Sequence, residues 1–303
     1  MAETRPRVTR STVPSSSMMP VNIPVHLALQ QKIRPDLGDH SVFQREGRRR
    51  GVHAPALHRG LGRPHVHPPI QLEGIRYGVE HWRRNRNDCR CMGALFWQIN
   101  DCWPVASWAS IDCFGRWKAL QYGAKRFFEP VLVSACEEGT KVELHITNET
   151  LVKIQGTLKW QLYHVDLGLI RQEKMICTVE RLHSACIKVL DFTRELQQEE
   201  DYRRYYVAYS FVMEEKNIGG GTVIFKPAKH FEFRKPEIHC EKLDGTTYRI
   251  AAGQFCKFVE VSFQEDLLLS DNYFDLIPGV EKIVTTDRET REMPVIYSLY
   301  DSY

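Results

Sequence analysis

The segment from Trp97 to Pro104 carries the side chains in this sequence that are best suited to binding chemistry. It reads Trp-Gln-Ile-Asn-Asp-Cys-Trp-Pro, so two indoles, two side-chain amides and one carboxylate lie close together. A sugar has an apolar face of C–H groups, against which an indole packs, and a rim of hydroxyls, which amides and carboxylates bind through hydrogen bonds. The segment therefore predicts a sugar-binding site. A plain corner of the hydrophobic core is the alternative that composition alone leaves open.

The neighbouring elements must position this segment. Residues 92–99 are largely apolar and are followed at once by polar residues, which predicts a β-strand buried on both faces with a functional end. Residues 70–86 predict an amphipathic helix with arginines at its C-terminus, where the helix dipole favours cations. Residues 115–128 predict a second amphipathic helix. Helix, buried strand, polar loop and helix is the order typical of the end of a (β/α) repeat.

From Pro130 onward the pattern changes to short runs rich in Val, Ile, Thr and aromatic residues. Turn residues at 138–139, 167–168 and 219–221 separate several of these runs, and Trp160 lies in the third run as an expected core residue. The predicted strands are 131–133, 141–147, 154–165, 169–179, 185–190, 205–214 and 221–233. Seven strands in about 100 residues predict an immunoglobulin-like β-sandwich over residues 130–235.

A second, smaller sandwich is predicted over residues 236–303. The segment 271–274 and the turn 277–279 are interpreted as loops within it. Its predicted strands are 237–242, 247–251, 255–263, 280–285 and 294–299.

Residues 1–69 differ from the rest in charge and composition. They hold 11 Lys and Arg against 4 Asp and Glu, nine of the 15 prolines, and one large aromatic residue, Phe43. So few large apolar groups cannot offset the entropy of ordering, so the segment is interpreted as disordered or as a mis-assigned exon. The Arg48–Arg50 cluster lacks an aromatic platform, which argues against nucleic-acid binding. The six histidines of the segment lack the spacing of a metal site.

The stretch from Gly93 to Phe128 closely resembles the end of the catalytic barrel in β-mannosidases of glycoside hydrolase family 2. The motifs that carry the resemblance are WQIND, CWPVASW, SIDCFGRWKAL and AKRFF. The helix with VEHWRR at 79–84, the segment DNYFDL at 271–276 and the closing SLYD at 298–301 also resemble that family. The resemblance covers about residues 70–303 and includes nothing in 1–69.

The resemblance implies a mainly β chain. Two immunoglobulin-like sandwiches would follow the last strand and flanking helices of a truncated TIM (β/α)8 barrel, over residues 70–129, and a disordered N-terminal segment. It implies a retaining glycoside hydrolase that removes terminal β-D-mannose from β-mannosides and mannooligosaccharides. Trp97 would form the floor of the mannose subsite and be followed by a cis peptide bond, with Asn100, Asp101 and Trp103 at the rim. Three further residues would brace the loop and helix behind the pocket: Trp108, Asp112 and Trp117.

The catalytic carboxylates of such an enzyme are missing from the expected places. Retaining glycosidases need two carboxylates about 5–5.5 Å apart. The family places both glutamates before the tryptophan strand, one after an Asn and one in a Ser-Glu-aromatic-Gly context. The glutamates before Trp97 match neither motif; they are Glu3, Glu46, Glu73 and Glu80. The pair Asn148-Glu149, which also forms a glycosylation sequon, lies downstream and is interpreted as a decoy. We therefore assign no catalytic residue and expect the chain to be inactive alone.

Two other functional classes stay open at this point. The chain could be a non-enzymatic carbohydrate-binding or structural β-sandwich module, or a subunit that completes a separately encoded barrel. No cofactor and no metal ion is expected. The truncated barrel would leave an apolar edge exposed, which predicts self-association through that edge.

Composition gives the expected compartment. The N-terminus has no apolar signal region and no apolar run reaches the length of a membrane span, so a cytoplasmic protein is expected rather than a secreted or membrane protein. Nine cysteines without a CxxC pair are interpreted as free thiols in a reducing compartment.

Overall fold

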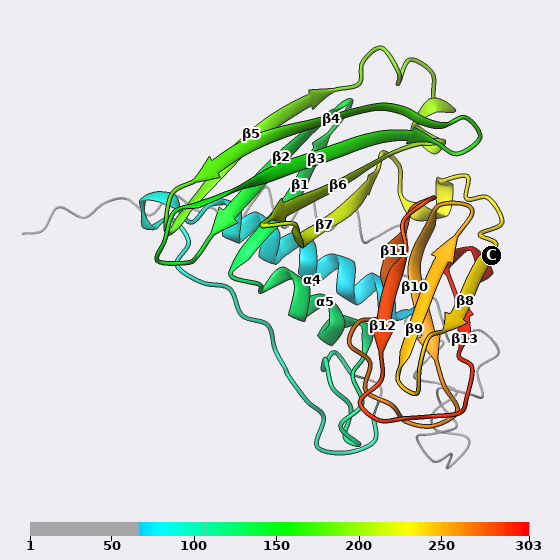
Figure 1. The fold of residues 1–303 in the computed structure, drawn as a ribbon. Helices are drawn as coiled ribbons and strands as arrows, with labels where there is room; N and C mark the ends of the chain where they lie inside the picture. Colours follow the sequence, from blue (N-terminus) through cyan, green and yellow to red (C-terminus); the bar gives the residue numbers. More distant parts are fainter. Residues whose placement is uncertain (1–66, 106, 303) are drawn as a thin grey trace, which may run out of the picture.

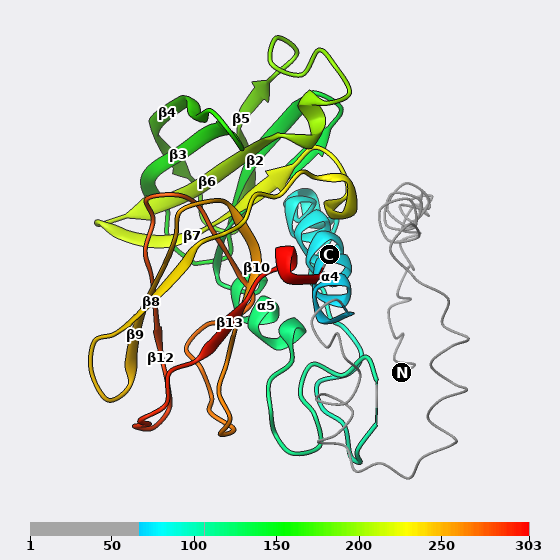
Figure 2. The same ribbon diagram turned by 90° about the vertical axis from the view of Figure 1, so that its right-hand side faces the viewer.

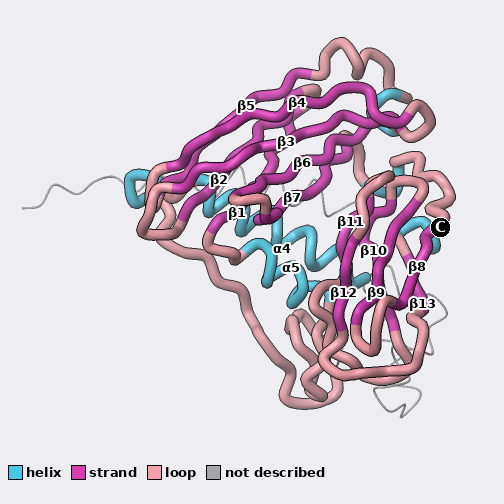
Figure 3. Tube along the Cα trace, in the orientation of Figure 1, coloured by secondary structure: helices cyan, strands magenta, loops and turns pink. Residues whose placement is uncertain are grey.

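The computed structural model describes residues 67–105 and 107–302. Residues 1–66 of the segment predicted to be disordered or mis-assigned lie outside this part of the chain, and the prediction is wrong for residues 67–69, which begin the first helix. The described part consists of a pair of α-helices followed by two β-sandwiches (Figures 1 and 3). The expected mainly β class with immunoglobulin-like domains is confirmed.

The two helices pack against each other at the base of the first sandwich (Figure 1). They are α4 (His67–Arg84) and α5 (Ala119–Phe127), close to the two predicted helices. Leu72 of α4 lies so close to Gly123 of α5 that a Cβ on Gly123 would fall 1.8 Å from a leucine methyl carbon. Glycine at this position therefore sets how closely the helices approach. No helix in the described ranges combines the length and the apolarity that crossing a bilayer requires.

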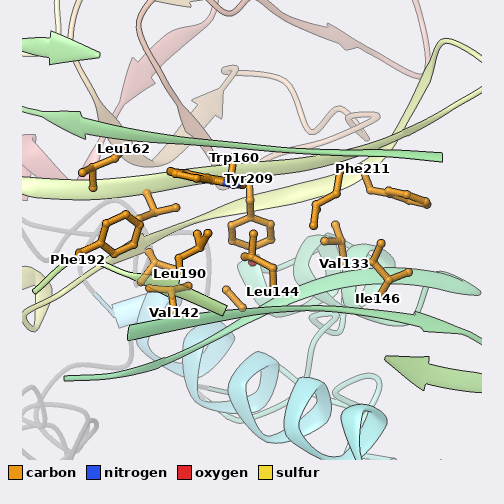
Figure 4. Close-up of a cluster of buried hydrophobic side chains, with 14 of the residues drawn as sticks. Val133, Val142, Leu144, Ile146, Trp160, Leu162, Leu190, Phe192, Tyr209 and Phe211 are labelled. Atoms are coloured by element: carbon orange, nitrogen blue, oxygen red, sulfur yellow. The ribbon is translucent and has the colours of Figure 1, made fainter. Parts of the chain in front are cut away.

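The first sandwich consists of seven antiparallel strands in two sheets. One sheet has the order β1-β2-β5 and the other β4-β3-β6-β7. The strands are β1 (Val131–Glu138), β2 (Lys141–Asn148), β3 (Ile154–His164), β4 (Gly168–Val179), β5 (His183–Asp191), β6 (Tyr205–Met213) and β7 (Lys216–Ile224). Alternate residues point inward, as a half-buried sheet requires, and Figure 4 shows Trp160 between the sheets with Phe192, Leu144 and Val142. The prediction that Trp160 is a core residue is confirmed, since it is 1% exposed.

The glycine triplet at 219–221 does not form the predicted turn; it lies inside β7, paired with β6. A Cβ on Gly220 would fall 2.3 Å from the carbonyl oxygen of Tyr209, so only glycine allows this close approach. The turn itself is formed by Glu214 and Glu215, whose φ angles are 47° and 66°. Strand β7 consequently ends at Ile224, and the predicted continuation to residue 233 is loop and a short 3-10 helix.

The second sandwich has two three-stranded sheets, with the orders β12-β9-β8 and β11-β10-β13. Its strands are β8 (Ile238–Lys242), β9 (Thr247–Ala252), β10 (Cys256–Ser262), β11 (Phe274–Leu276), β12 (Lys282–Thr285) and β13 (Val295–Tyr297). Strand β11 was not predicted, and its first residue, Phe274, was assigned to a loop, because three residues are too few to show an alternating pattern. The chain then returns to the helices, where Leu299 packs against the helical core (Figure 2).

The C-terminal end of α4 is bound to the first sandwich by four nearly consecutive side chains. Buried Arg83 donates to the carbonyl oxygens of residues 127 and 129 and forms an ion pair with Glu149 at 3.1 Å. Arg84 donates to residues 134 and 135, Arg86 to the carbonyl of 148, and Asn87 to the carbonyl of 184. These contacts fix the helix pair against the edge of the sandwich.

Candidate functional site

The segment 93–101 runs extended but forms no regular strand. Its exposure alternates: Ala94, Phe96 and Gln98 are partly buried, whereas Leu95 and Trp97 are 87% and 76% exposed. The prediction of a strand buried on both faces is therefore wrong for this chain. The physical reason is that the described residues supply no strand beside it and no layer over its outer face.

The buried face of this segment packs against the helices. Ala94 and Phe96 contact the helical core, and the ring of Phe96 stacks on Phe128 with centroids 6.3 Å apart. The opposite face presents Leu95, Trp97 and Ile99 to solvent, the last 60% exposed. An extended segment with helices on one side and an uncovered apolar row on the other has the layering of one strand of a (β/α) barrel.

A short ladder holds the functional end of the segment. Ile111 donates to the carbonyl of Ile99 at 2.8 Å, Asp101 donates to the carbonyl of Ile111 at 3.0 Å, and Asn100 and Ile111 form a parallel bridge. The Ser110 hydroxyl links this ladder to α5 through Gln121 at 2.8 Å. The peptide bond between Trp97 and Gln98 is cis, as the resemblance implied.

Asp101 is the buried polar centre of the loop. Its side chain is 2% exposed, forms an ion pair with Lys118 at 2.8 Å and accepts a hydrogen bond from Ser107. Burial acts to raise the pKa of the Asp101 carboxyl, but the hydrogen bonds from Lys118 and Ser107 outweigh it and hold that pKa below its ordinary value. The carboxylate is therefore ionised at neutral pH and directed into the loop rather than toward solvent.

The remaining predicted site residues are exposed. Trp103 is 67% exposed and Asn100 also lies at the surface, where its side-chain amide donates to the carbonyl of Asp101 at 3.3 Å. The structure thus brings Asn100 and Asp101 together at the ladder and leaves the indoles of Trp97 and Trp103 open to solvent. Their contact with a sugar stays a prediction.

The three residues expected to brace the loop differ from one another. Asp112 accepts hydrogen bonds from two backbone amides and pairs with Arg116 at 2.6 Å, and Trp117 packs edge-on against Tyr122 with centroids 5.2 Å apart. Both stabilise the loop and its junction with α5. Trp108 is 63% exposed, and its carbonyl oxygen accepts a hydrogen bond from Gln71 of α4. Its indole is thus a third exposed tryptophan ring beside the ladder.

Sequence analysis missed Lys118 and Ser107 as partners of Asp101. Lys118 precedes α5 and is separated from Asp101 by a loop, so no short spacing or motif marks the pair. Asp101 and Lys118 meet because the hydrogen bonds of Ile111 with Ile99 and Asp101 bring Asp101 close to the start of α5.

The glutamates near this loop have structural partners. Glu73 and Glu80 both pair with Arg76, at 2.8 and 3.0 Å, along one side of α4. Glu149 pairs with Arg83, and Asn148 is fully buried with its amide donating to three carbonyl oxygens. Glu3 and Glu46 lie outside the described residues. Among the residues described, these contacts place no pair of glutamates across a pocket at Trp97.

Comparison with known families identifies both sandwiches. Residues 140–230 match the model of the Mannosidase Ig/CBM-like domain, and residues 233–302 match the model of an Ig-fold domain.

Curated relatives extend the similarity beyond the sandwiches. The chain is 27% identical over 240 residues to "Beta-mannosidase B" of Neosartorya fischeri, an alignment that covers 71% of the chain and 28% of the relative. It is 35% identical over 114 residues to "Beta-mannosidase B" of Aspergillus flavus, covering 33% of the chain and 14% of the relative. The chain thus spans under a third of the length of these relatives.

Solved structures show the same fold. The β-D-mannosidase of Dictyoglomus thermophilum superposes with a TM-score of 0.66 at 22% identity, covering 77% of this chain and 29% of that one. The exo-chitosanase of Amycolatopsis orientalis superposes with a TM-score of 0.59 at 16% identity, covering 76% and 33%. At these identities the superpositions establish the architecture and not the substrate.

Proposed function

We propose, from the similarity of this chain to the C-terminal part of the β-mannosidases of glycoside hydrolase family 2, that it carries one wall of a mannose-binding site. The complete site would act in a retaining glycoside hydrolase that releases terminal β-D-mannose. Trp97, Asn100 and Trp103 would contact the sugar, and Asp101 would act as a positioning residue that holds the ladder through Lys118.

One observation carries this proposal. The extended segment buries Phe96 against the helices and exposes Leu95, Trp97 and Ile99 on its other face. In a closed (β/α)8 barrel that other face points to the barrel interior, and the polar residues that follow the strand line the mouth where active sites lie. A barrel strand would show an exposed row of this kind, here Leu95, Trp97 and Ile99, when another part of the polypeptide supplies the other strands of the barrel.

We further propose that the chain does not cleave glycosides alone. Cleavage with retention requires an acid/base and a nucleophile about 5–5.5 Å apart. The carboxylates of Glu73 and Glu80 are engaged in ion pairs with Arg76, and that of Glu149 in an ion pair with Arg83. Trp97 and Asn100 can bind a sugar but cannot protonate a leaving group.

The test uses the full chain with an aryl β-mannoside and with mannobiose. We expect no aryl release above the buffer rate, and a saturable change of tryptophan fluorescence with mannobiose. Trp97→Ala is expected to weaken mannobiose binding by about tenfold or more, which corresponds to about 1.4 kcal/mol. Trp82→Ala, which removes a partly exposed indole on α4 outside the site, is the matched control and should leave binding unchanged.

Two results would contradict the proposal. Aryl release that disappears in Glu80→Gln would show that a glutamate of this chain is catalytic after all. Mannobiose binding that survives both Trp97→Ala and Trp103→Ala would place the sugar on a sandwich and favour the second candidate, a non-enzymatic carbohydrate-binding module. The core of the first sandwich, to which only residues of the sandwich itself contribute, is the observation that favours this second candidate.

A further inference from the structure

Three metal-ligating side chains meet on the outer face of the first sandwich. Glu143 and His145 come from β2 and Cys186 from β5, and their ligand atoms all lie within 4.8 Å of one another. Nε2 of His145 is 3.0 Å from Oε2 of Glu143. This group is far along the chain from the Trp97 loop and has no part in the proposed sugar site.

The fold of the sheet explains why the three side chains converge. Val142, Leu144 and Ile146 point into the core between the sheets, as Figure 4 shows, so the intervening Glu143 and His145 point to the opposite face. A β-bulge between residues 144 and 145 shifts the register of β2 and β5. After that shift His145 lies directly opposite Cys186. The side chains of such cross-strand neighbours are close enough to bind the same metal ion.

We propose that Glu143, His145 and Cys186 bind one Zn²⁺ ion. Carboxylate oxygen, imidazole nitrogen and thiolate sulfur are the three donor types that zinc takes in proteins, and a mixed set of this kind excludes Ca²⁺ and Mg²⁺, which prefer oxygen alone. Three protein ligands leave the fourth tetrahedral position to water. Glu143 and Cys186 are exposed, so the ion has an open path to the site.

The surroundings suit a neutral imidazole. Burial lowers the pKa of His145, the hydrogen bond that its ring N–H donates to the Glu143 carboxylate opposes this, and the guanidinium of Arg84 on α4 adds to the lowering. Zinc binds the neutral form of imidazole, so burial and Arg84 favour the form that the ion needs. Arg84 donates a hydrogen bond to the Ser134 hydroxyl and forms an ion pair with Glu80 at 3.8 Å, so the negative charge of Glu80 offsets part of its positive charge.

The thiol must lose its proton when the ion binds. Burial raises the pKa of the Cys186 thiol, and the nearby Glu143 and Cys136 raise it further. Zinc binding therefore releases the thiol proton to solvent while the sulfur electron pair forms the bond to the metal.

The proposal is tested with the full chain by titration with Co²⁺, which reports thiolate ligation through a near-ultraviolet charge-transfer band, followed by displacement with Zn²⁺. We expect one equivalent of Co²⁺ to produce this band and one equivalent of Zn²⁺ to abolish it. Cys186→Ser should remove the band, whereas Cys102→Ser, which removes an exposed thiol elsewhere, should retain it. The charge-transfer signal also excludes the histidines before residue 69, which lack a thiol neighbour in that segment.

Two further variants, which change the other two ligands, test the zinc site in case one of them folds poorly. Glu143→Gln changes an exposed side chain and His145→Gln removes the imidazole; each is expected to weaken Zn²⁺ binding by about 100-fold or more, since even second-shell changes cost about 10–100-fold. Circular dichroism would verify that each variant is folded. A band that is absent in the unaltered chain, or that persists in folded Cys186→Ser, would overturn the zinc site.

Discussion

Trp160 and Trp97 both lie in extended segments in which exposure alternates, yet one is 1% exposed and the other 76%. Trp160 lies in β3, and the sheet β1-β2-β5 covers its indole, where it meets the edge of Phe192 with centroids 6.0 Å apart. Trp97 faces away from the helices, and no layer in the described ranges covers it. What differs is whether the described part of the chain supplies the second layer.

The difference follows from the two architectures. A sandwich closes on itself, because two sheets built from neighbouring segments cover each other. The inner face of a barrel strand is covered only when the other strands of the barrel are present. The same kind of residue is therefore a core residue in the first region and an exposed residue in the second.

The largest expected difference between the two tryptophans is their contribution to stability, and a pair of matched substitutions measures it. Trp160→Ala is expected to lower the free energy of unfolding by about 3–5 kcal/mol, since it leaves a cavity between the sheets. Trp97→Ala is expected to change it by about 0.5 kcal/mol or less, because the exposed indole loses little burial. Urea unfolding followed by circular dichroism measures both. Equal destabilisation by the two variants would show that Trp97 is covered in solution.

A second substitution probes the buried centre of the loop. Asp101→Asn is expected to destabilise the ladder locally by about 1–3 kcal/mol, because charged hydrogen bonds from Lys118 and Ser107 are lost. Faster amide hydrogen exchange at Ile111 and Lys118 would report the loss. Glu180→Gln, which breaks an exposed ion pair with Lys153, is the control and should have almost no effect.

The same carboxylate gives the loop a defined dependence on pH. The folded-state pKa of Asp101 lies below the ordinary value of 3.8, so its stabilisation is fully present above that value and is lost as the pH falls through the folded-state pKa. Hydrogen exchange of the ladder amides should therefore rise on acidification in the unaltered chain and not in Asp101→Asn. A similar rise in both proteins would assign the acid sensitivity to another group.

The smallest expected effect concerns association between copies of the chain. The exposed row of Leu95, Trp97 and Ile99 predicts self-association. Leu95→Glu is expected to raise the dissociation constant of this self-association by about tenfold, or about 1.4 kcal/mol. Ile176→Glu is the matched control, since Ile176 is 71% exposed on β4 outside the row. Sedimentation velocity over a range of concentrations measures both. A strictly monomeric unaltered chain at high concentration would show that the row is not adhesive.

The sequence predicted those features that local pattern determines. Runs rich in Val, Ile, Thr and aromatic residues, separated by turn residues, identified most strands of the sandwiches, and the position of Trp160 in the third run placed it in the core. The helix at 67–84 was predicted from its amphipathic stripe and its terminal arginines. The sugar site at the tryptophan block, inferred from residue types and from resemblance, stays a prediction.

Features that depend on contacts between distant segments were not predictable. Gly220 was interpreted as a turn residue, and only the carbonyl of Tyr209 beside it reveals that the strand itself needs glycine. The turn was formed instead by Glu214 and Glu215, which carry no turn signature in the sequence. The inward direction of the Asp101 carboxylate likewise follows from Lys118, which no motif connects to it.

The arginine-rich end of α4 has a mechanical consequence. Arg83 is 5% exposed and holds two carbonyl oxygens and Glu149 at once, and its neighbours along the chain are bound to residues on both β1 and β5. A helix tethered at so many points has no freedom to swing about its own end. Any polypeptide that packs against α4 would thus meet the first sandwich in one fixed orientation.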